Sequence, residues 1–267
     1  MLAFFAANQA GAAPYASHVT NNAGTIQFIL NESCDNAYVL FDNGAVSNSL
    51  GALPRGAQSF ALGAHTNYTI AAFKIGSGTP TQISVEGTST LNFPAARGLA
   101  VNANPQDWHF GLVYVANSSP GNTASATLAK YRGLYIMNAD TTDVFGRGTN
   151  VSGGVFSTAS SSSPYRANVG PDGTVYVGDF STAAATVWKF DPEVANKSTW
   201  TNLLAPIGEI SGNIVHQDIT GKPCVTGSLA TSNLVLYTDD AALGPVFNSI
   251  NQYTIGAGPV PYSNAPV

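Results

Sequence analysis

The feature that most constrains the fold of this chain is a succession of short apolar runs bounded by Gly, Asn or Pro. Runs of about four to eight residues rich in Val, Ile, Phe and Tyr are typical of β-strands. They include TIQFIL (25–30), AYVLF (37–41), LVYVAN (112–117) and TVYVG (174–178). No apolar window reaches the roughly 18 residues that a transmembrane helix needs. The sequence therefore predicts an all-β fold without a transmembrane segment.

Charged residues make up 9% of the 267-residue chain, where about 25% is usual. The net charge of −5 comes from 15 acidic and 10 basic residues that form no runs. A nucleic-acid partner is therefore not expected, because no basic stripe could neutralise phosphates. The polar surface must be built from Ser, Thr, Asn and Gly, which is common on secreted and assembling proteins.

Residues 1–22 form an N-terminal segment whose start, MLAFFAANQAGAA, resembles the end of a secretory signal. It lacks a basic stretch before the apolar run, so a retained strand or helix is the alternative. We expect an extracellular or cell-surface protein. The two cysteines, Cys34 and Cys224, form either one long-range disulfide or two separate buried thiols.

Residues 23–77 alternate in the pattern of a small β-sandwich, with a tight turn predicted at Asp42-Asn43-Gly44. This segment resembles the Ig-like module of flagellar hook-cap proteins and secreted bacterial proteins. The matching residues are 26–30, 38–42, LPRGAQSF (53–60) and 68–75. The Trp-containing segment usual after the Phe is absent, so the resemblance implies a trimmed Ig-like sandwich. A linker is expected over residues 78–94.

Residues 95–267 contain a repeated motif of a turn residue, an apolar run and then Asn or Asp. Its copies are GLVYVANSS (111–119), GLYIMNADT (133–141), GTVYVGDFS (173–181) and NLVLYTDDA (233–241), which start 22, 40 and 60 residues apart. Entry strands ARGLAV and YRANVG precede the first and third copies. We interpret each as part of a strand, turn and strand unit of about 40 to 50 residues, the size of a propeller blade.

The stretch PYRANVGPDGTVYVGDFSTAAATVWKFDPE (164–193) resembles a blade of NHL-type β-propellers. The resemblance implies β-propeller-like repeats after the sandwich, as in secreted bacterial proteins that join such modules. Four blades at most fit the length, and the uneven spacing favours an incomplete propeller. Asp172 and Gly173 are then turn residues, with Val175 and Val177 on one face of the strand and Tyr176 on the other.

QDWHF brings Asp107, Trp108 and His109 together in a loop inserted between an entry strand and its partner. Aromatic rings stack on the apolar faces of sugars while carboxylates accept from hydroxyls, so this loop is a candidate carbohydrate site. The alternative is a hydrophobic plug, since Trp and Phe most often serve packing.

Acidic residues at predicted strand ends, above all Asp140, Asp179 and Asp239, could bind Ca²⁺ around a propeller channel. A ring of acidic and amide side chains does this in the calcium-dependent lactonase-like propellers that the repeats resemble. The alternative is that each Asp caps its own turn through hydrogen bonds to the backbone. No other cofactor is expected.

No catalytic motif stands out: G-x-S-x-G is absent, and the four glutamates form no acid/base pair. We therefore expect an extracellular, non-enzymatic β-rich structural or binding protein that self-assembles at the cell surface or in a matrix. Uncharged strand edges favour self-association, because edges without charges lack the usual protection against pairing. The alternatives are a propeller hydrolase or lactonase with a divalent metal in its channel, and a carbohydrate-binding protein.

Overall fold

The computed structural model of the chain describes residues 14–76, 93–119, 121–122, 129–130, 132–142, 144, 164–178, 187–190, 192, 201–202, 209–210, 213–214, 222–240 and 249–256. The chain divides into two compact units, Met1–Ile83 and Ser84–Val267. In the described residues both units are built from antiparallel strands, joined in one place by a short 3-10 turn, η1 (Asp42–Gly44). The predicted all-β class is confirmed.

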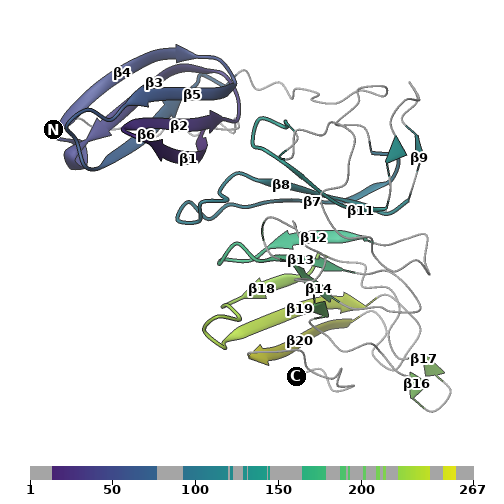
Figure 1. Cartoon of the computed structure of the whole chain (residues 1–267). Coiled ribbons are helices and arrows are strands. Elements are labelled where there is room, and N and C mark those ends of the chain that lie inside the picture. Colours follow the sequence, from purple (N-terminus) through teal and green to yellow (C-terminus); the bar gives the residue numbers. More distant parts are fainter. Residues whose placement is uncertain are drawn as a thin grey trace. The chain divides into compact units, whose positions relative to one another are not determined.

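The first unit contains two three-stranded sheets (Figure 1), with strand orders β1-β2-β5 and β4-β3-β6. The strands are β1 (Ala16–Asn22), β2 (Thr25–Leu30), β3 (Cys34–Phe41), β4 (Val46–Leu53), β5 (Gly56–Ala61) and β6 (Tyr68–Phe73). Strand β1 lies within the segment 1–22 and pairs with β2, so that segment contributes a strand to this unit.

One apolar core joins the two sheets of the first unit. Alternate residues of β2 and β3 point into it, as the two-residue period of a strand requires. The buried members are Ile26, Phe28, Leu30, Cys34, Ala37, Val39, Phe41 and Phe60. Burial of each large side chain stabilises the unit by about 1.5–3 kcal/mol.

The predicted tight turn connects β3 to β4. Asp42, Asn43 and Gly44 have φ values of 53°, 58° and 88°, the left-handed region that Asp, Asn and Gly tolerate best. Asn67 supports the turn, because its side-chain oxygen accepts from the backbone N–H of Asn43 at 3.0 Å. This prediction is confirmed.

The second unit contains three larger sheets that lie one after another (Figure 1). The first sheet is formed by β7 (Ala96–Val101), β8 (Val113–Asn117) and β11 (Gly133–Met137). The second consists of β12 (Arg166–Val169), β13 (Val175–Gly178), β14 (Val187–Phe190) and β15 (Thr201–Asn202). The third comprises β18 (Cys224–Thr226), β19 (Leu234–Asp240) and β20 (Ser249–Gly256).

Two short hairpins complete the described strands: β9 (Gly121–Asn122) with β10 (Ala129–Lys130), and β16 (Glu209–Ile210) with β17 (Asn213–Ile214). None of the sheets described in either unit closes on itself.

The repeat has a longer period than the sequence indicated. The motif at 133–141 is not a separate unit, because β11 pairs with β8 in the first sheet. The other three motifs supply the middle strands β8, β13 and β19, and 62 residues separate Val113 from Val175 while 59 separate Val175 from Leu234. The blade-sized spacing of 40 was therefore wrong, because it measured from the last strand of one sheet to the middle strand of the next. The two entry strands, by contrast, are confirmed as β7 and β12.

The second sheet is covered on both faces. Val175 and Val177 pack against the first sheet in a cluster with Tyr114 and Ile136. Tyr176, between them in sequence, packs against the third sheet. The predicted division of β13 into two apolar faces is confirmed, and all four of its residues are buried.

Glycines allow the sheets to approach closely. A β-carbon added at Gly98 in β7 would lie 2.7 Å from the backbone nitrogen of Ala167 in β12, a separation that real side chains do not tolerate. One added at Gly170, just after β12, would lie 3.2 Å from Val225 in β18. The entry strands β7, β12 and β18 therefore form a column through the three sheets.

The two cysteines are free thiols in different units. Cys34 is buried in the core of the first unit, and Cys224 is exposed on the third sheet. Of the two arrangements left open by the sequence, the structure has separate thiols, although only Cys34 is buried.

Candidate functional site

The Asp107-Trp108-His109 sequence lies in a loop between β7 and β8, as predicted. Residues 102–112 form this loop. Its base is closed by the backbone N–H of Asn102, which donates to the carbonyl of Leu112 at 2.9 Å, and by Gly111 N–H, which donates to Asn102 at the same distance. The loop therefore extends the β7–β8 hairpin and fixes the position of its tip.

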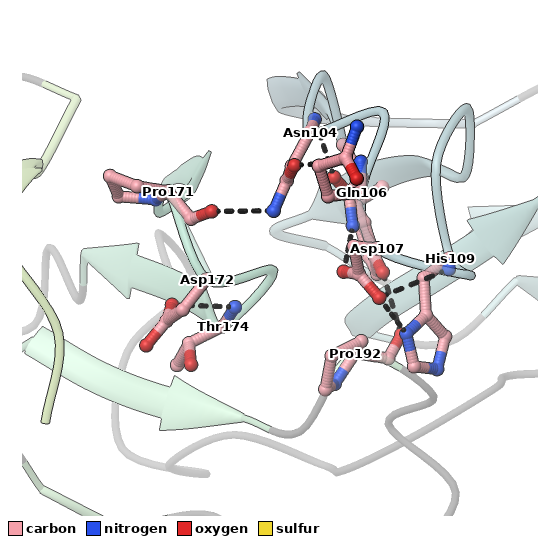
Figure 2. Close-up of polar contacts among 10 residues, drawn as sticks. Asn104, Gln106, Asp107, His109, Pro171, Asp172, Thr174 and Pro192 are labelled. Carbon is pink, nitrogen blue, oxygen red and sulfur yellow. Dashed lines mark hydrogen bonds and ion pairs between the residues drawn. The ribbon is translucent and has the colours of Figure 1, made fainter. Parts of the chain in front are cut away.

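Both carboxylate oxygens of Asp107 accept hydrogen bonds from within the loop (Figure 2). Oδ1 accepts from His109 Nδ1 at 2.8 Å and from the His109 backbone N–H at 3.2 Å. Oδ2 accepts from Asn102 Nδ2 at 2.6 Å. An ionised carboxylate only accepts, so these bonds place the proton of the imidazole on Nδ1.

The loop changes the acidity of Asp107. Burial alone would raise the pKa of this carboxyl, but the hydrogen bonds from His109 and Asn102 and the charge of His109 outweigh burial and lower the pKa from its usual 3.8. The side chains of His109 and Asp107 are only 9% and 12% exposed. The pair is an ionised, shielded anchor rather than a carboxylate open to a ligand.

Trp108 behaves differently from its two neighbours. Its side chain is 56% exposed, and its ring lies 3.8 Å from that of His109, centroid to centroid, at a tilt of 41°. The predicted plug therefore does not describe Trp108, whereas His109, at 7% exposure, does pack inside the loop. The structure brings the three predicted residues together but gives them different roles.

The turn of the second sheet rests on this loop. Asn104 Nδ2 donates to the carbonyl of Pro171 at 2.8 Å (Figure 2). Gly173 has a φ of 82°, and a β-carbon there would overlap Oδ2 of Asp107. The Asp107 carboxylate thus forms the surface on which the Gly173 turn packs.

The same turn contacts the third sheet. Asp172 Oδ1 accepts from the backbone N–H of Thr174 at 3.1 Å, which confirms its predicted role as a turn residue. Its other oxygen accepts from the hydroxyl of Ser228, in the β18–β19 turn, at 2.5 Å. Polar bonds therefore connect the three successive turns of the second unit.

The candidate calcium ligands are dispersed. Asp140 lies in the turn after β11, where Oδ1 accepts from the backbone N–H and the hydroxyl of Thr142 at 3.1 and 2.6 Å. Asp239 is near the end of β19, opposite Ile250 of β20. Asp179 lies outside the described residues. Within the part of the chain that the structure describes, no three His, Cys, Asp or Glu residues gather in a way that could hold a metal ion.

Two other histidines are described. His65 Nδ1 lies 2.7 Å from Asp42 Oδ2, and its ring stacks on Phe41 with centroids 4.1 Å apart. His18 lines a shallow groove with Gln27, Phe28 and Ser59 on the β1-β2-β5 sheet. His216 is outside the described residues.

Sequence reasoning missed Asn102 and Asn104. Each accepts, through its side-chain oxygen, the backbone N–H two residues on: Asn102 from Asn104 at 3.0 Å and Asn104 from Gln106 at 2.9 Å. The signal was present in the sequence NANPQD, because Asn residues at a spacing of two before Pro and Asp are typical of successive Asx-turns.

Comparison with known proteins identifies no relative: no family model matches the chain, and no curated protein matches it. Among the described residues, no helix has the length and apolar character needed to cross a membrane.

Proposed function

We propose that this chain is an extracellular, non-enzymatic β-rich structural protein that associates with copies of itself. In this proposal the first unit is an Ig-like sandwich, and the second is a set of propeller-like repeats that forms an incomplete ring. The paired three-stranded sheets of the first unit and the recurring entry strands of the second support it.

The observation that carries the proposal is the lack of charge on the sheet edges of the first unit. Strands β1, β4, β5 and β6 are the outer strands of the two sheets, and none contains Lys, Arg, Asp, Glu or Pro. Natural edge strands normally carry such residues, or bulges, to prevent pairing with another chain. The pairings of β5 and β6 with their neighbours contain no bulge. These two edges are therefore suited to strand pairing between molecules.

The geometry of the Asp107 loop supports a structural rather than a catalytic role. A general base needs a carboxylate or imidazole within reach of a substrate. Asp107 instead uses both oxygens inside the loop and supports the Gly173 turn. The most chemically suggestive cluster of the described residues thus stabilises the fold.

Light scattering of the purified full chain over a range of concentrations tests self-association. We expect a mass above the 27.5 kDa of one chain that rises with concentration. The double variant Ala57→Lys, Ala71→Lys puts a charge on the exposed side of β5 and of β6, and should lower that mass. Gln27→Lys, on the exposed side of the central strand β2, is the matched control and should not. A single-chain mass at every concentration would refute the proposal.

Carbohydrate binding is a second candidate function, and the exposure of Trp108 favours it. An indole ring that is 56% exposed beside a rigid, hydrogen-bonded loop is a pre-organised surface for stacking on a sugar. Titration with soluble polysaccharides, followed by tryptophan fluorescence, tests this. Binding that is lost in Trp108→Ala and kept in Gln106→Ala would support it, and unchanged fluorescence across neutral and acidic polysaccharides would exclude it.

A further inference from the structure

Each sheet of the second unit has two faces, and the second sheet defines them. Its back face, with Val175 and Val177, packs on the first sheet, and its front face, with Tyr176, packs on the third. By the same definition the first sheet has a free back face and the third sheet a free front face. These two end faces lie at opposite ends of one row of sheets.

The back face of the first sheet is open along its entry strand. Over β8 and β11 this face is buried, and Phe93 packs on Tyr135 there with ring centroids 5.0 Å apart. Along β7, however, Leu99 is 63% exposed and Val101 is 44% exposed. This leaves an apolar strip one strand wide.

The front face of the third sheet is open along the corresponding strand. Cys224 and Thr226 of β18 are exposed, while Val225 between them packs toward the second sheet. Ile250 of β20, on the same face as its partner Asp239, is 78% exposed. The strip is uncharged along β18 and flanked by an apolar side chain.

The repeat relates the two strips to a contact that the chain already makes. The pairs Val101–Val113, Val169–Val175 and Val225–Leu236 occupy equivalent places in the three sheets, because each is the back-facing pair nearest the turn. Ala100 and Cys224, one residue before Val101 and Val225, are therefore equivalent front-facing residues. Ala100 packs in one cluster with Ala167 and the neighbouring Val169, whose equivalents in β7 are Leu99 and Val101.

From this equivalence we infer that the front face of the third sheet binds the back face of the first sheet in a second copy of the chain. Strand β18 of one molecule lies beside β7 of the next, as β7 lies beside β12 within a molecule. The inference rests on the self-association proposed above and names the surface that makes it. The contact joins two different surfaces, so it adds molecules head to tail in a closed ring or an open filament.

A second copy is the occupant that the structure favours. The second and third sheets show how this sequence covers a back face: with the front face of a neighbouring sheet of the same design. Gly98, which permits the close approach of β7 to β12, shows that the column of entry strands packs backbone against backbone. A sheet with the same repeat therefore fits the strip better than an unrelated partner does.

Cysteine cross-linking tests the inference directly, because the chain has one exposed thiol, Cys224, on the proposed surface. In Val101→Cys the new thiol should lie beside Cys224 of the next molecule, within the distance of about 4.4–6.8 Å between Cα atoms that a disulfide spans. Mild oxidation of the full chain should then give a ladder of covalent oligomers, with a 101–224 link identified by peptide mass spectrometry. The matched control is Gln106→Cys, which is exposed on the same sheet but off its back face, and it should give no ladder.

Two results would overturn the inference. One is a Val101→Cys protein that stays single-chain after oxidation with both exposed thiols free. The other is a 101–224 link inside one chain, which would show that the first and third sheets meet within a molecule. Fluorescence and circular dichroism identical to the unmodified protein establish that the variant is folded.

A charge variant separates this inference from the proposed function. Leu99→Glu should reduce the mass measured by light scattering, whereas Gln106→Glu should leave it unchanged. If the unmodified chain self-associates but Leu99→Glu has no effect and no 101–224 link forms, then self-association stands and this surface is wrong. If the unmodified chain is a single molecule at every concentration, the proposed function fails as well.

Discussion

Removal of the Asp107 carboxylate should destabilise the second unit. Asp107→Ala deletes three hydrogen bonds, at 2.6, 2.8 and 3.2 Å. Hydrogen bonds to a charged group contribute roughly 1.5–3 kcal/mol each in buried sites. Because the third bond is long and the pair retains some exposure, we assign about 1.5 kcal/mol to each of the two shorter bonds, or about 3 kcal/mol in total.

Such a loss is measurable by thermal unfolding. For a unit of this size, each kcal/mol shifts the midpoint by about 2–4 °C, so we expect a drop of roughly 6–12 °C. The three tryptophans, Trp108, Trp188 and Trp200, all lie in the second unit. Tryptophan fluorescence therefore reports the unfolding of this unit alone, without interference from the first.

The control is Gln106→Ala, an exposed neighbour that takes part in the loop through its backbone N–H. Exposed substitutions of this kind change stability by no more than about 0.5 kcal/mol. A midpoint for Asp107→Ala within the error of Gln106→Ala would refute the conclusion that the carboxylate is an architectural anchor, and would reopen a ligand-binding role for it.

Three further predictions concern other parts of the molecule. Gly173→Ala should destabilise the second unit more than Gly256→Ala does, because both glycines have positive φ but only Gly173 would place a methyl group against Asp107; equal losses would contradict the close approach. The stability that Asp107 contributes should be present above its unfolded pKa near 3.8 and be lost as the pH falls through its lower folded pKa. The difference in unfolding free energy between the unmodified protein and Asp107→Asn should therefore shrink from pH 5 to pH 3, and a constant difference would refute this. A thiol reagent should label Cys224 in the folded protein and Cys34 only after unfolding; rapid labelling of both would show that the core around Cys34 opens.

Part of the fold could be predicted because its signals are local. The Asp42-Asn43-Gly44 turn, the strands on either side of Pro171-Asp172-Gly173 and the two faces of β13 follow from φ preferences and from the two-residue period of a strand. The length of the repeat could not be predicted in this way. GLYIMNADT resembles a middle strand in composition, and only its pairing with β8 shows that it is the last strand of the same sheet.

The candidate site shows the same limit. The sequence placed Asp107, Trp108 and His109 in one loop, but their roles depend on contacts with distant residues. Asn102 on β7's side of the loop and Gly173 in the next sheet determine that Asp107 faces inward. Trp108 remains exposed beside a buried histidine, a difference between adjacent residues that no composition or motif predicts.

By itself, the sequence determined the all-β class and the position of the hairpin turns, because strand periodicity and turn chemistry act between residues that are near one another in the chain. The tertiary structure alone decided which strands share a sheet, that the second sheet is buried on both faces, and that Asp107 supports a turn 66 residues away at Gly173. These features depend on pairings between distant segments, whose energy is set by packing rather than by local preference.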